Sequence, residues 1–483
     1  MIKTLLNKYK LLSVTVKATF WFTVCNFLLK GISFITVPIF AAILPTAEYG
    51  AMSIYYSYEQ IFLIFATLEL SIGAYQRGVI KYKDNEKLFT TSVIVLGNII
   101  TFINLIVFCI FQDWIVSFTN ISMTILVLML MYFFVQPAYN AWLTRKRFSY
   151  EYKPAVLATL LFSILTTAIS LFAVYLIEQT STIKIISALI VEIIFCLFFY
   201  IKNLNIVLFF KNLNLVKEYW IYCLKFQMPL LFHSLSYLLL SQSDRVMIGN
   251  LVNNTKAAIY SVAYNLASAV LIFQQSLNQV FKPWRYQKME SKEYATIYST
   301  STTVTLLLGV MICLFILLAP DVIRLLFRKE YYESIWTIPP VSISVFFMYL
   351  YSMFSDIESY FYDTKYMAFI SVSCAILNIV LNYFGIILFG YIACAYTTLI
   401  TYVIFSLGHY YFMKKSLKRN GVKAKIYDVK KLSIISIIIL IYGLIVLVLY
   451  KYDFLRYLAL VLILSLIVYK RKYFINVIKT MKN

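Results

Sequence analysis

The segment M-P-L-L-F-H-S-L-S-Y-L-L-L, residues 228–240, runs directly into S-Q-S-D-R-V-M-I-G-N, residues 241–250. The first part is almost wholly apolar, and the two parts together are long enough to cross a hydrocarbon core of about 30 Å as a helix. The second part places Asp244 beside Arg245. Because backbone groups in lipid must be satisfied within their own segment, such a run folds as a helix. The stretch therefore predicts a membrane-spanning helix that carries two opposite charges.

The whole chain shares this apolar composition. Hydrophobic residues make up 62% of the 483 residues and charged residues only 13%, and the mean hydropathy is +0.81. A soluble protein of this composition would have too few polar residues to cover its surface. The composition therefore predicts an all-α integral membrane protein.

Fourteen transmembrane helices are predicted from the apolar runs, and the segments between them are too short to form further domains. The first run is too long for a signal-peptide core and lacks a small-residue cleavage site after it, so we expect it to remain in the protein. The predicted spans are 17–44, 50–74, 89–111, 121–143, 154–177, 183–202, 225–250, 256–281, 296–320, 336–360, 367–389, 391–413, 432–450 and 455–470.

The positive charge is distributed unevenly between the two sides of these spans. The chain has 43 Lys and Arg residues and a formal net charge of +22. With the N-terminus in the cytoplasm, 34 of them fall in inward segments and 7, including Lys184, in outward loops. This asymmetry follows the positive-inside rule and predicts that both termini are cytoplasmic. The excess charge therefore indicates topology and contact with anionic lipids, and we expect no nucleic-acid partner.

The cysteines give no sign of a metal site or a disulfide framework. They lie in or beside apolar spans, without C-x-x-C spacing and without a histidine partner, so we interpret them as small core residues and expect no cofactor. The seven are Cys25, Cys109, Cys196, Cys223, Cys313, Cys374 and Cys394.

An internal repeat relates two halves of the chain at an offset of 208 residues. S-I-Y-Y at 53–56 aligns with S-V-A-Y at 261–264, and Arg77 aligns with Arg285. Parallel repeats of six helices are common in transporters that work by alternating access, whereas a channel or a receptor is the alternative. The predicted organisation is a first lobe 1–202, a cytoplasmic linker 203–224, a second lobe 225–413, a basic cytoplasmic linker 414–431, a helix pair 432–470 and a cytoplasmic tail 471–483.

Five motifs resemble one family. D-R-V-M-I-G-N-L at 244–251, followed by A-A-I-Y-S-V-A-Y at 257–264, resembles the seventh and eighth helices of the polysaccharide branch of the MOP exporter superfamily. A-I-L-N-I-V-L-N-Y at 375–383 and G-Y-I-A-C-A-Y-T-T-L-I-T-Y at 390–402 resemble helices eleven and twelve of its Wzx-type O-antigen and capsule repeat-unit flippases. A-P-D-V-I-R-L-L-F-R-K-E-Y-Y-E-S at 319–334 resembles their outward loop between helices nine and ten.

The resemblance implies a V-shaped, MATE-like pair of six-helix lobes followed by a C-terminal helix pair. It implies a flippase that moves undecaprenyl-diphosphate-linked oligosaccharide from the cytoplasmic to the outer leaflet of the bacterial inner membrane. Membrane lipids and the polysaccharide polymerase and chain-length regulator of the same pathway are the implied partners. A lipid II or teichoic-acid-type flippase and a cation-coupled multidrug exporter are alternatives. A membrane polymerase or glycosyltransferase fits less well, because the outward loops are short and no nucleotide-binding glycine motif is present.

Charges within the spans are the candidate substrate-binding residues, because a diphosphate requires a polar and partly cationic cavity. Lys30 lies roughly 20 Å into the first span, and Glu59 lies at a similar depth in the second. Lys30 is either a cavity cation or the partner of Glu59 in an ion pair. Asp244 and Arg245 lie roughly 27 Å into the seventh span, near its outer end. They either line the cavity or form a salt bridge at the outer rim.

Two arginines mark inner ends of spans. Arg77 and the repeat-related Arg285 are expected to border the cytoplasmic entrance, where a cation meets an incoming diphosphate; snorkelling to lipid phosphates is the alternative. Asp356 and Glu358, near the inner end of the tenth span, are expected to be interfacial.

Three further residues are candidates for ion coupling. Glu192 lies in the middle of the sixth span, and Glu69 marks the inner end of the second. His233 lies about 12 Å into the seventh span, and its side chain titrates near physiological pH. The alternative for Glu192 is a partnered carboxylic acid, and for His233 a neutral hydrogen-bonding group between helices.

Overall fold

The computed structural model describes residues 13–71 and 73–469, and all regular secondary structure in this part of the chain is helical. The all-α class predicted from the composition is therefore confirmed. The chain divides into two compact units between Leu238 and Leu239.

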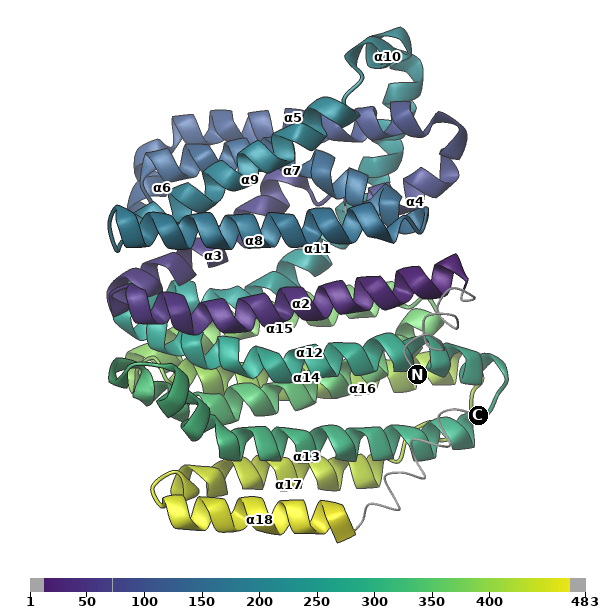
Figure 1. Ribbon diagram of the computed structural model, residues 1–483. Coiled ribbons are helices and arrows are strands. Elements are labelled where there is room, and N and C mark those ends of the chain that lie inside the picture. The colour runs from purple at the N-terminus through teal and green to yellow at the C-terminus, as the bar shows by residue number, and fades with distance from the viewer. Residues whose placement is uncertain (1–12, 72, 470–483) are drawn as a thin grey trace, which may run out of the picture. The chain divides into compact units, whose positions relative to one another are not determined.

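The first unit consists of long helices packed against one another, with short helices in their connections (Figure 1). Exposed Ile, Leu and Phe side chains occur along its outer faces, as expected for helices that contact lipid. Its helices are α2 (Val14–Ile43), α3 (Thr46–Thr67), α4 (Ala74–Lys81), η1 (Lys83–Asn85), α5 (Glu86–Ile110), α6 (Gln112–Thr119), α7 (Met123–Phe148), α8 (Tyr152–Leu176), α9 (Ser181–Asn203), α10 (Ile206–Lys211) and the first part of α11 (Leu213–Leu251).

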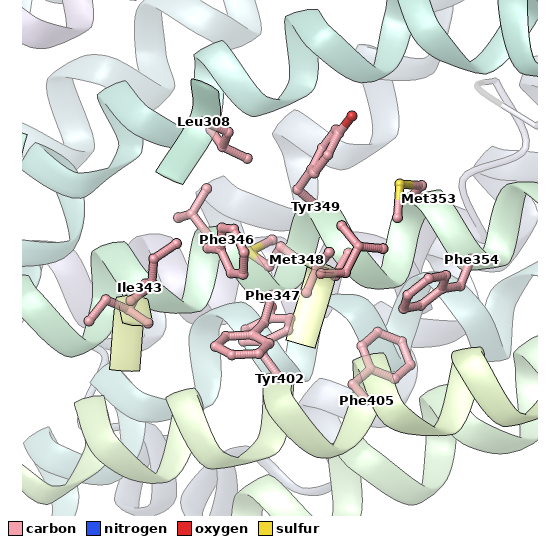
Figure 2. Close-up of a cluster of buried hydrophobic side chains, with 14 of the residues drawn as sticks. Leu308, Ile343, Phe346, Phe347, Met348, Tyr349, Met353, Phe354, Tyr402 and Phe405 are labelled. Atoms are coloured by element: carbon pink, nitrogen blue, oxygen red, sulfur yellow. The ribbon is translucent and has the colours of Figure 1, made fainter. Parts of the chain in front are cut away.

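The second unit packs around one central helix, α14. In the most apolar stretch of 18 residues in α14, 89% of the residues are buried. The side chains of this helix form the core together with Tyr402 and Phe405 of α16 (Figure 2). The remaining helices surround α14 or flank it. After the end of α11, the helices of this unit are α12 (Asn254–Glu290), α13 (Tyr294–Leu326), η2 (Lys329–Trp336), α14 (Ile338–Tyr360), α15 (Thr364–Phe389), α16 (Ala393–Arg419), α17 (Val429–Leu449) and α18 (Asp453–Tyr469).

Each of the fourteen predicted spans overlaps with a long helix of the described chain. Ten of the described helices are long and apolar enough to cross a membrane. Crossing by the other four, α3, α11, α16 and α18, stays a prediction.

The predicted end of the second span is wrong. The helix stops at Thr67 instead of 74, and the next two residues, Leu68 and Glu69, have positive φ angles of 47° and 48°. A second helix then starts at Ala74, whose N–H donates to the side-chain oxygen of Gln227 at 3.0 Å. The side chain that caps α4 comes from α11, so no pattern in the residues near the break predicts it.

The residues expected to form the inter-lobe linker are themselves helical. Helix α11 starts at Leu213 and continues without interruption to Leu251. Its first turns are fixed in unit 1, because Val216, Tyr219 and Cys223 pack into a core cluster that includes Phe89 of α5. The division between the compact units therefore falls within α11 rather than at its start.

Helices α17 and α18 pack against α13 in unit 2 (Figure 1). The hydroxyl groups of Tyr442 and Tyr450 donate to backbone carbonyls of α13 at 2.7 Å each. Gly309 of α13 permits a close approach, because a Cβ there would lie 2.7 Å from the side chain of Ile439 on α17. The C-terminal helix pair is thus an integral part of unit 2.

An ion-pair network fixes the end of this pair. Arg456 of α18 is 1% exposed and donates to both carboxylate oxygens of Asp321 on α13, at 2.5 and 2.8 Å. The same guanidinium donates to the carbonyl oxygen of Leu317 at 2.7 Å. Two charged hydrogen bonds from a buried arginine stabilise this contact more than an exposed pair does.

Candidate functional site

A polar stripe runs along one face of α2 and includes Lys30 near the middle of the helix. Its members are separated by three or four residues, so they lie on the same face of the helix. All of them are exposed, and the threonines at 19 and 23 bond their hydroxyls to the preceding helical turn. The amide and the ammonium group remain available to a ligand. The stripe consists of Thr15, Thr19, Thr23, Asn26, Lys30 and Ser33.

No ion pair joins Lys30 to Glu59 in the described part of the chain. The charged groups that interact with Glu59 are Glu192 and Lys184, both on α9. Lys30 is exposed instead. The described structure therefore lacks the contact on which the ion-pair alternative for Lys30 depends.

An ionisable cluster lies inside unit 1, between α3 and α9. Lys184, which the charge count assigned to an outward loop, is a buried residue of α9 with 8% of its surface exposed. Its ammonium donates to the hydroxyl of Tyr56 and lies 4.4 Å from the centre of that ring. Glu59 and Glu192 are half-buried, interact electrostatically with each other and with this lysine, and form no direct salt bridge within the described residues.

The start of α9 is held by a second carboxylate from α3. Glu48 accepts hydrogen bonds from the backbone N–H of Ser181 at 2.7 Å and from its hydroxyl at 2.5 Å. This contact satisfies donors at the helix N-terminus that have no intrahelical partner. It fixes the register between α3 and α9, and thereby the positions of the cluster side chains one to three turns further on.

Asp244 lies at the centre of a buried polar network in unit 2. It is 0% exposed and accepts hydrogen bonds from Tyr260 of α12, from Asn382 of α15 at 2.6 Å and from Thr398 of α16 at 3.0 Å. Asn378 extends the network, because it donates to Thr398 at 3.2 Å and accepts from Asn382 at 3.2 Å. A carboxylate on α11 therefore organises three other helices through neutral donors.

Arg245 takes different partners from its neighbour. Its guanidinium donates to the side-chain oxygen of Gln242 and lies 4.4 Å from the centre of the Tyr264 ring. The side chain is 7% exposed. Adjacent helical positions point about 100° apart, so the two charges serve two separate contacts. The structure places both residues in the interior of unit 2.

Arg285 is buried in an ion pair. Its Nε donates to the carboxylate of Asp356 on α14 at 3.1 Å, and a terminal nitrogen donates to the same oxygen. Lys282, one turn earlier, lies 3.4 Å from the other oxygen of that carboxylate and is half-exposed. The side chain of Arg285 is 1% exposed, so it contacts its partner rather than solvent.

Both Asp356 and Glu358 are buried within unit 2, and their location at the level of the membrane interface stays a prediction. Glu358 is 0% exposed and pairs with Nδ1 of His409 on α16 at 2.8 Å. The histidine gave no signal in the sequence, since its partner lies 51 residues away on another helix.

The remaining candidates lie apart from these clusters. Arg77 on α4 is exposed, with its guanidinium 5.1 Å from the centre of the Phe226 ring. Glu69 lies in the break between α3 and α4 and is half-buried. His233 belongs to α11, but its side chain lies outside the described part of the structure.

No group of three or more His, Cys, Asp and Glu side chains in residues 13–71 and 73–469 has the arrangement of a metal site. The polar groups of the described chain include the α2 stripe, the cluster between α3 and α9, the network around Asp244 and the buried pairs Arg285–Asp356 and Glu358–His409. Such charges inside apolar helices are typical of transport pathways rather than of lipid-facing surfaces. Fold and charges together define an integral membrane protein whose apolar helices carry charged side chains.

The chain belongs to the family described as polysaccharide biosynthesis protein, whose model matches residues 15–287. A second model, MatE, matches residues 229–384. The curated relative "Lsg locus putative protein 1" of Haemophilus influenzae is 24% identical over 282 residues, which cover 55% of this chain and 64% of the relative. The match thus spans less than two thirds of that relative's length. The polysaccharide branch of the MOP superfamily, indicated by the five motifs, is confirmed.

Two solved structures share the fold. The lipid II flippase MurJ, in an inward closed conformation, superposes with a TM-score of 0.65 at 14% identity, covering 94% of this chain and 99% of that one. An inward-facing multidrug resistance MATE family transporter also gives a TM-score of 0.65, at 12% identity, covering 82% of this chain and 96% of that one. These neighbours are transporters and flippases rather than enzymes.

Proposed function

We propose that the chain is a flippase for undecaprenyl-diphosphate-linked oligosaccharide repeat units. It moves them from the cytoplasmic to the outer leaflet of a bacterial inner membrane for the synthesis of O-antigen or capsule. Membership of the polysaccharide biosynthesis family and the relative named after an Lsg locus support a role in surface polysaccharide synthesis. Both termini are cytoplasmic in this proposal, as the positive-inside rule requires.

The observation that carries the proposal is the exposed polar stripe with Lys30 on α2. An ammonium near the middle of a span costs about 3 kcal/mol in contact with lipid on insertion scales, so such a group faces water or a partner. Since no ion pair to Glu59 accounts for it in the described chain, we expect the stripe to line a hydrated pathway. A cation flanked by hydroxyl and amide groups suits a diphosphate that carries sugars.

The other arginines and acidic residues have narrower roles in this proposal. Arg77 is exposed at the end of unit 1 that carries the basic connections, and there it would meet the diphosphate first. Asp244, Arg245 and Arg285 are buried in contacts within unit 2, so we assign them to holding that unit together during transport. Glu59 acts through the cluster with Lys184 rather than by direct substrate contact.

We assign ion coupling to Glu192 together with Glu59. Two half-buried carboxylates and one buried lysine, without a direct salt bridge among the described residues, form a group that changes its charge when a proton or a cation binds. Glu192→Gln should reduce transport and alter its pH dependence, whereas Glu178→Gln, at an exposed position before α9, should not. An unchanged pH profile in Glu192→Gln would move the coupling role to His233 or Glu69.

The same cluster favours a second candidate, a cation-coupled multidrug exporter. Carboxylates within the first lobe suit a cationic substrate or a coupling cation, and the MATE fold neighbour is named for multidrug resistance. The two candidates differ in a direct test. Cells that lack the protein should lose surface polysaccharide under the first, and gain sensitivity to cationic drugs under the second. The lipid II or teichoic-acid-type flippase predicts a growth or envelope defect instead.

Lys30 provides the residue-level test. Lys30→Ala should leave the protein inserted and at normal abundance while the export of surface polysaccharide falls sharply. Lys30→Arg should retain part of the export, because it keeps the charge but changes its shape and hydration. Lys153→Ala, which removes an exposed lysine near the start of α8, is the matched control and should export normally. Normal export by Lys30→Ala at wild-type abundance would refute the anchoring role.

A further inference from the structure

A hollow of about 470 Å³ lies at one end of unit 1, outside the residues assigned to transport. Three connections form it: the turn η1 with the start of α5, the last turns of α7, and α10 with the residue after it. Three basic side chains, Lys83, Lys87 and Arg145, line it together with the polar residues Asn85 and Asn212. Its volume falls within the range of small-molecule binding sites.

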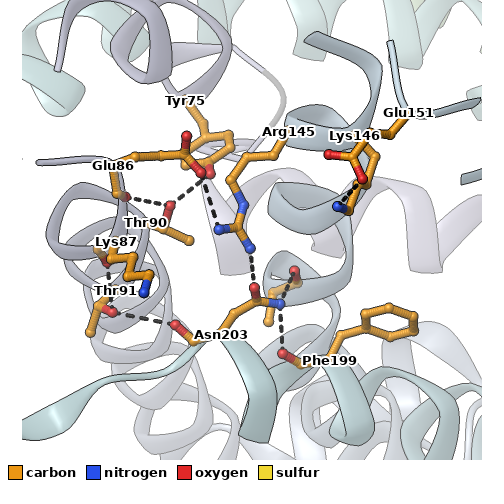
Figure 3. A network of polar contacts seen from close by, with 11 residues as sticks. Tyr75, Glu86, Lys87, Thr90, Thr91, Arg145, Lys146, Glu151, Phe199 and Asn203 are labelled. Atoms are coloured by element: carbon orange, nitrogen blue, oxygen red, sulfur yellow. Dashed lines mark hydrogen bonds and ion pairs between the residues drawn. The ribbon is translucent and has the colours of Figure 1, made fainter. Parts of the chain in front are cut away.

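Arg145 is already neutralised at the edge of this hollow. Its guanidinium donates to the carboxylate of Glu86 at 3.2 Å and to the side-chain oxygen of Asn203 (Figure 3). Asn203 is held in turn by the backbone of α9, because its amide nitrogen donates to the carbonyl of Phe199 at 2.7 Å. This network forms a rigid wall, and it leaves the remaining charge of the hollow to other residues.

The remaining charge is positive. Lys83 and Lys87 lie one helical turn apart and are exposed, and neither forms a salt bridge among the described residues. Asp84 is the one further carboxylate in the lining, so two ammonium groups face a single acid. The side chains of Asp84, Asn85 and Asn212 can bond hydroxyl groups. The lining therefore combines a phosphate-binding cation pair with groups that recognise a polyol.

The position along the chain indicates where a ligand would come from. The connections 75–88, 144–153 and 202–225 carry four basic residues each, and the positive-inside rule assigns them to the cytoplasmic side. Since α5 and α7 are spanning helices, their ends at this side lie at the level of the lipid headgroups. Basic pockets at the cytoplasmic ends of spanning helices bind anionic headgroups.

We propose that this hollow binds the headgroup of an anionic phospholipid of the phosphatidylglycerol type, taken from the cytoplasmic leaflet. The phosphate lies between Lys83 and Lys87, and the glycerol hydroxyls bond Asp84, Asn85 and Asn212. A bound headgroup joins three connections of unit 1 that come from separate parts of the sequence. Lipid binding therefore stabilises unit 1 at the end from which α11 departs.

The test measures thermal unfolding of the purified full-length protein in detergent with increasing mole fractions of phosphatidylglycerol. Phosphatidylglycerol should raise the midpoint in a saturable manner, and phosphatidylcholine should not. In Lys83→Gln/Lys87→Gln, half of the effect should require at least a fivefold higher lipid fraction. The matched control Lys418→Gln/Lys423→Gln removes the same charge from the basic linker of unit 2 and should respond as the wild type does.

Further arms separate the sources of the phosphate. Lys83→Arg/Lys87→Arg keeps the charge and should keep the response. Phosphatidic acid, which lacks the glycerol headgroup, should be weaker, and equal potency would overturn the assignment of the polyol groups. Stabilisation of the same size by inorganic phosphate or sn-glycerol 3-phosphate alone would overturn the lipid assignment. If the Lys83→Gln/Lys87→Gln variant and its control respond equally, the lipid stabilises the protein through non-specific charge. That result would refute the site.

Discussion

Replacement of Arg285 by methionine separates a structural ion pair from a substrate contact. The guanidinium is 1% exposed, and two of its nitrogens donate to one oxygen of Asp356. Methionine fills much of the same volume but leaves that carboxylate, which is 6% exposed, with Lys282 alone. Lys282 is 49% exposed and lies 3.4 Å away, so Lys282→Met is a matched control at the same carboxylate.

The expected magnitude follows from burial. Removal of one partner from a buried ion pair costs about 3–5 kcal/mol, because the other charge stays in the interior. An exposed pair such as that with Lys282 contributes about 0–1 kcal/mol. Arg285→Met should therefore lower the free energy of unfolding by about 3 kcal/mol or more, and Lys282→Met by less than about 1 kcal/mol. The double variant Arg285→Met/Asp356→Leu should lie within about 1 kcal/mol of the wild type, since apolar residues replace both charges.

The assay is reversible unfolding of the purified variants by a denaturing detergent in mixed micelles, with polysaccharide export measured in cells that express the same variants. If Arg285 is structural, the double variant recovers abundance and export together. Recovery of stability without recovery of export would assign a substrate contact to Arg285 and refute this reasoning. Equal stability of Arg285→Met and Lys282→Met would refute the buried-pair argument itself.

Substitutions at three further contacts, those of Asp244, Arg456 and Gly73, are tested by the same unfolding assay. Asp244→Asn keeps one oxygen, which can accept from both Tyr260 and Thr398, and should cost about 1 kcal/mol, whereas Asp244→Ala removes the acceptor for all three donors and should cost about 3 kcal/mol or more. Arg456→Ala should cost about 2–4 kcal/mol and expose the C-terminal helix pair to limited proteolysis. Gly73→Ala should lower the unfolding midpoint, because its Cβ would meet the Gln227 side chain at 2.1 Å, while Gly31→Ala meets nothing within 4 Å and should not.

Hydropathy predicts the long helices well because their physical cause is local. A run of apolar residues has to satisfy its own backbone in lipid, so its position can be read without knowledge of its neighbours. The break after Thr67 escaped prediction for the opposite reason. It depends on Gln227, which is distant in sequence and caps α4 from another helix. The turn itself uses Leu68 and Glu69, which do not mark a left-handed conformation as glycine or asparagine would.

The candidate charges were found by depth, but their partners were not. The cost of a charge within an apolar run selects Lys30, Glu59, Glu192 and Asp244 from the sequence alone. A partner on another helix cannot be read from spacing, and Lys184 was therefore assigned to a loop although it lies inside unit 1 with Tyr56. The depth of a charged residue along its helix determines the free-energy cost of placing it there. The packing of the helices determines which partner offsets that cost.

The candidate charges of the two units have different surroundings. This difference indicates which unit carries the residues that act in transport. In unit 2, each candidate charge is itself buried and contacts a partner within the unit: Asp244 has three donors, Arg245 has Gln242 and an aromatic ring, and Arg285 has Asp356. Their charges are compensated within the fold and are poorly placed to bind a passing diphosphate. In unit 1, Lys30 is exposed near the middle of a span, and the described part of the cluster between α3 and α9 holds its carboxylates without a direct salt bridge.

Substitutions that impair export at normal abundance should therefore concentrate in α2, α3 and α9, while those in α11, α12 and α14 should act through folding. A scan in which the second group lowers export without lowering abundance would reverse this assignment.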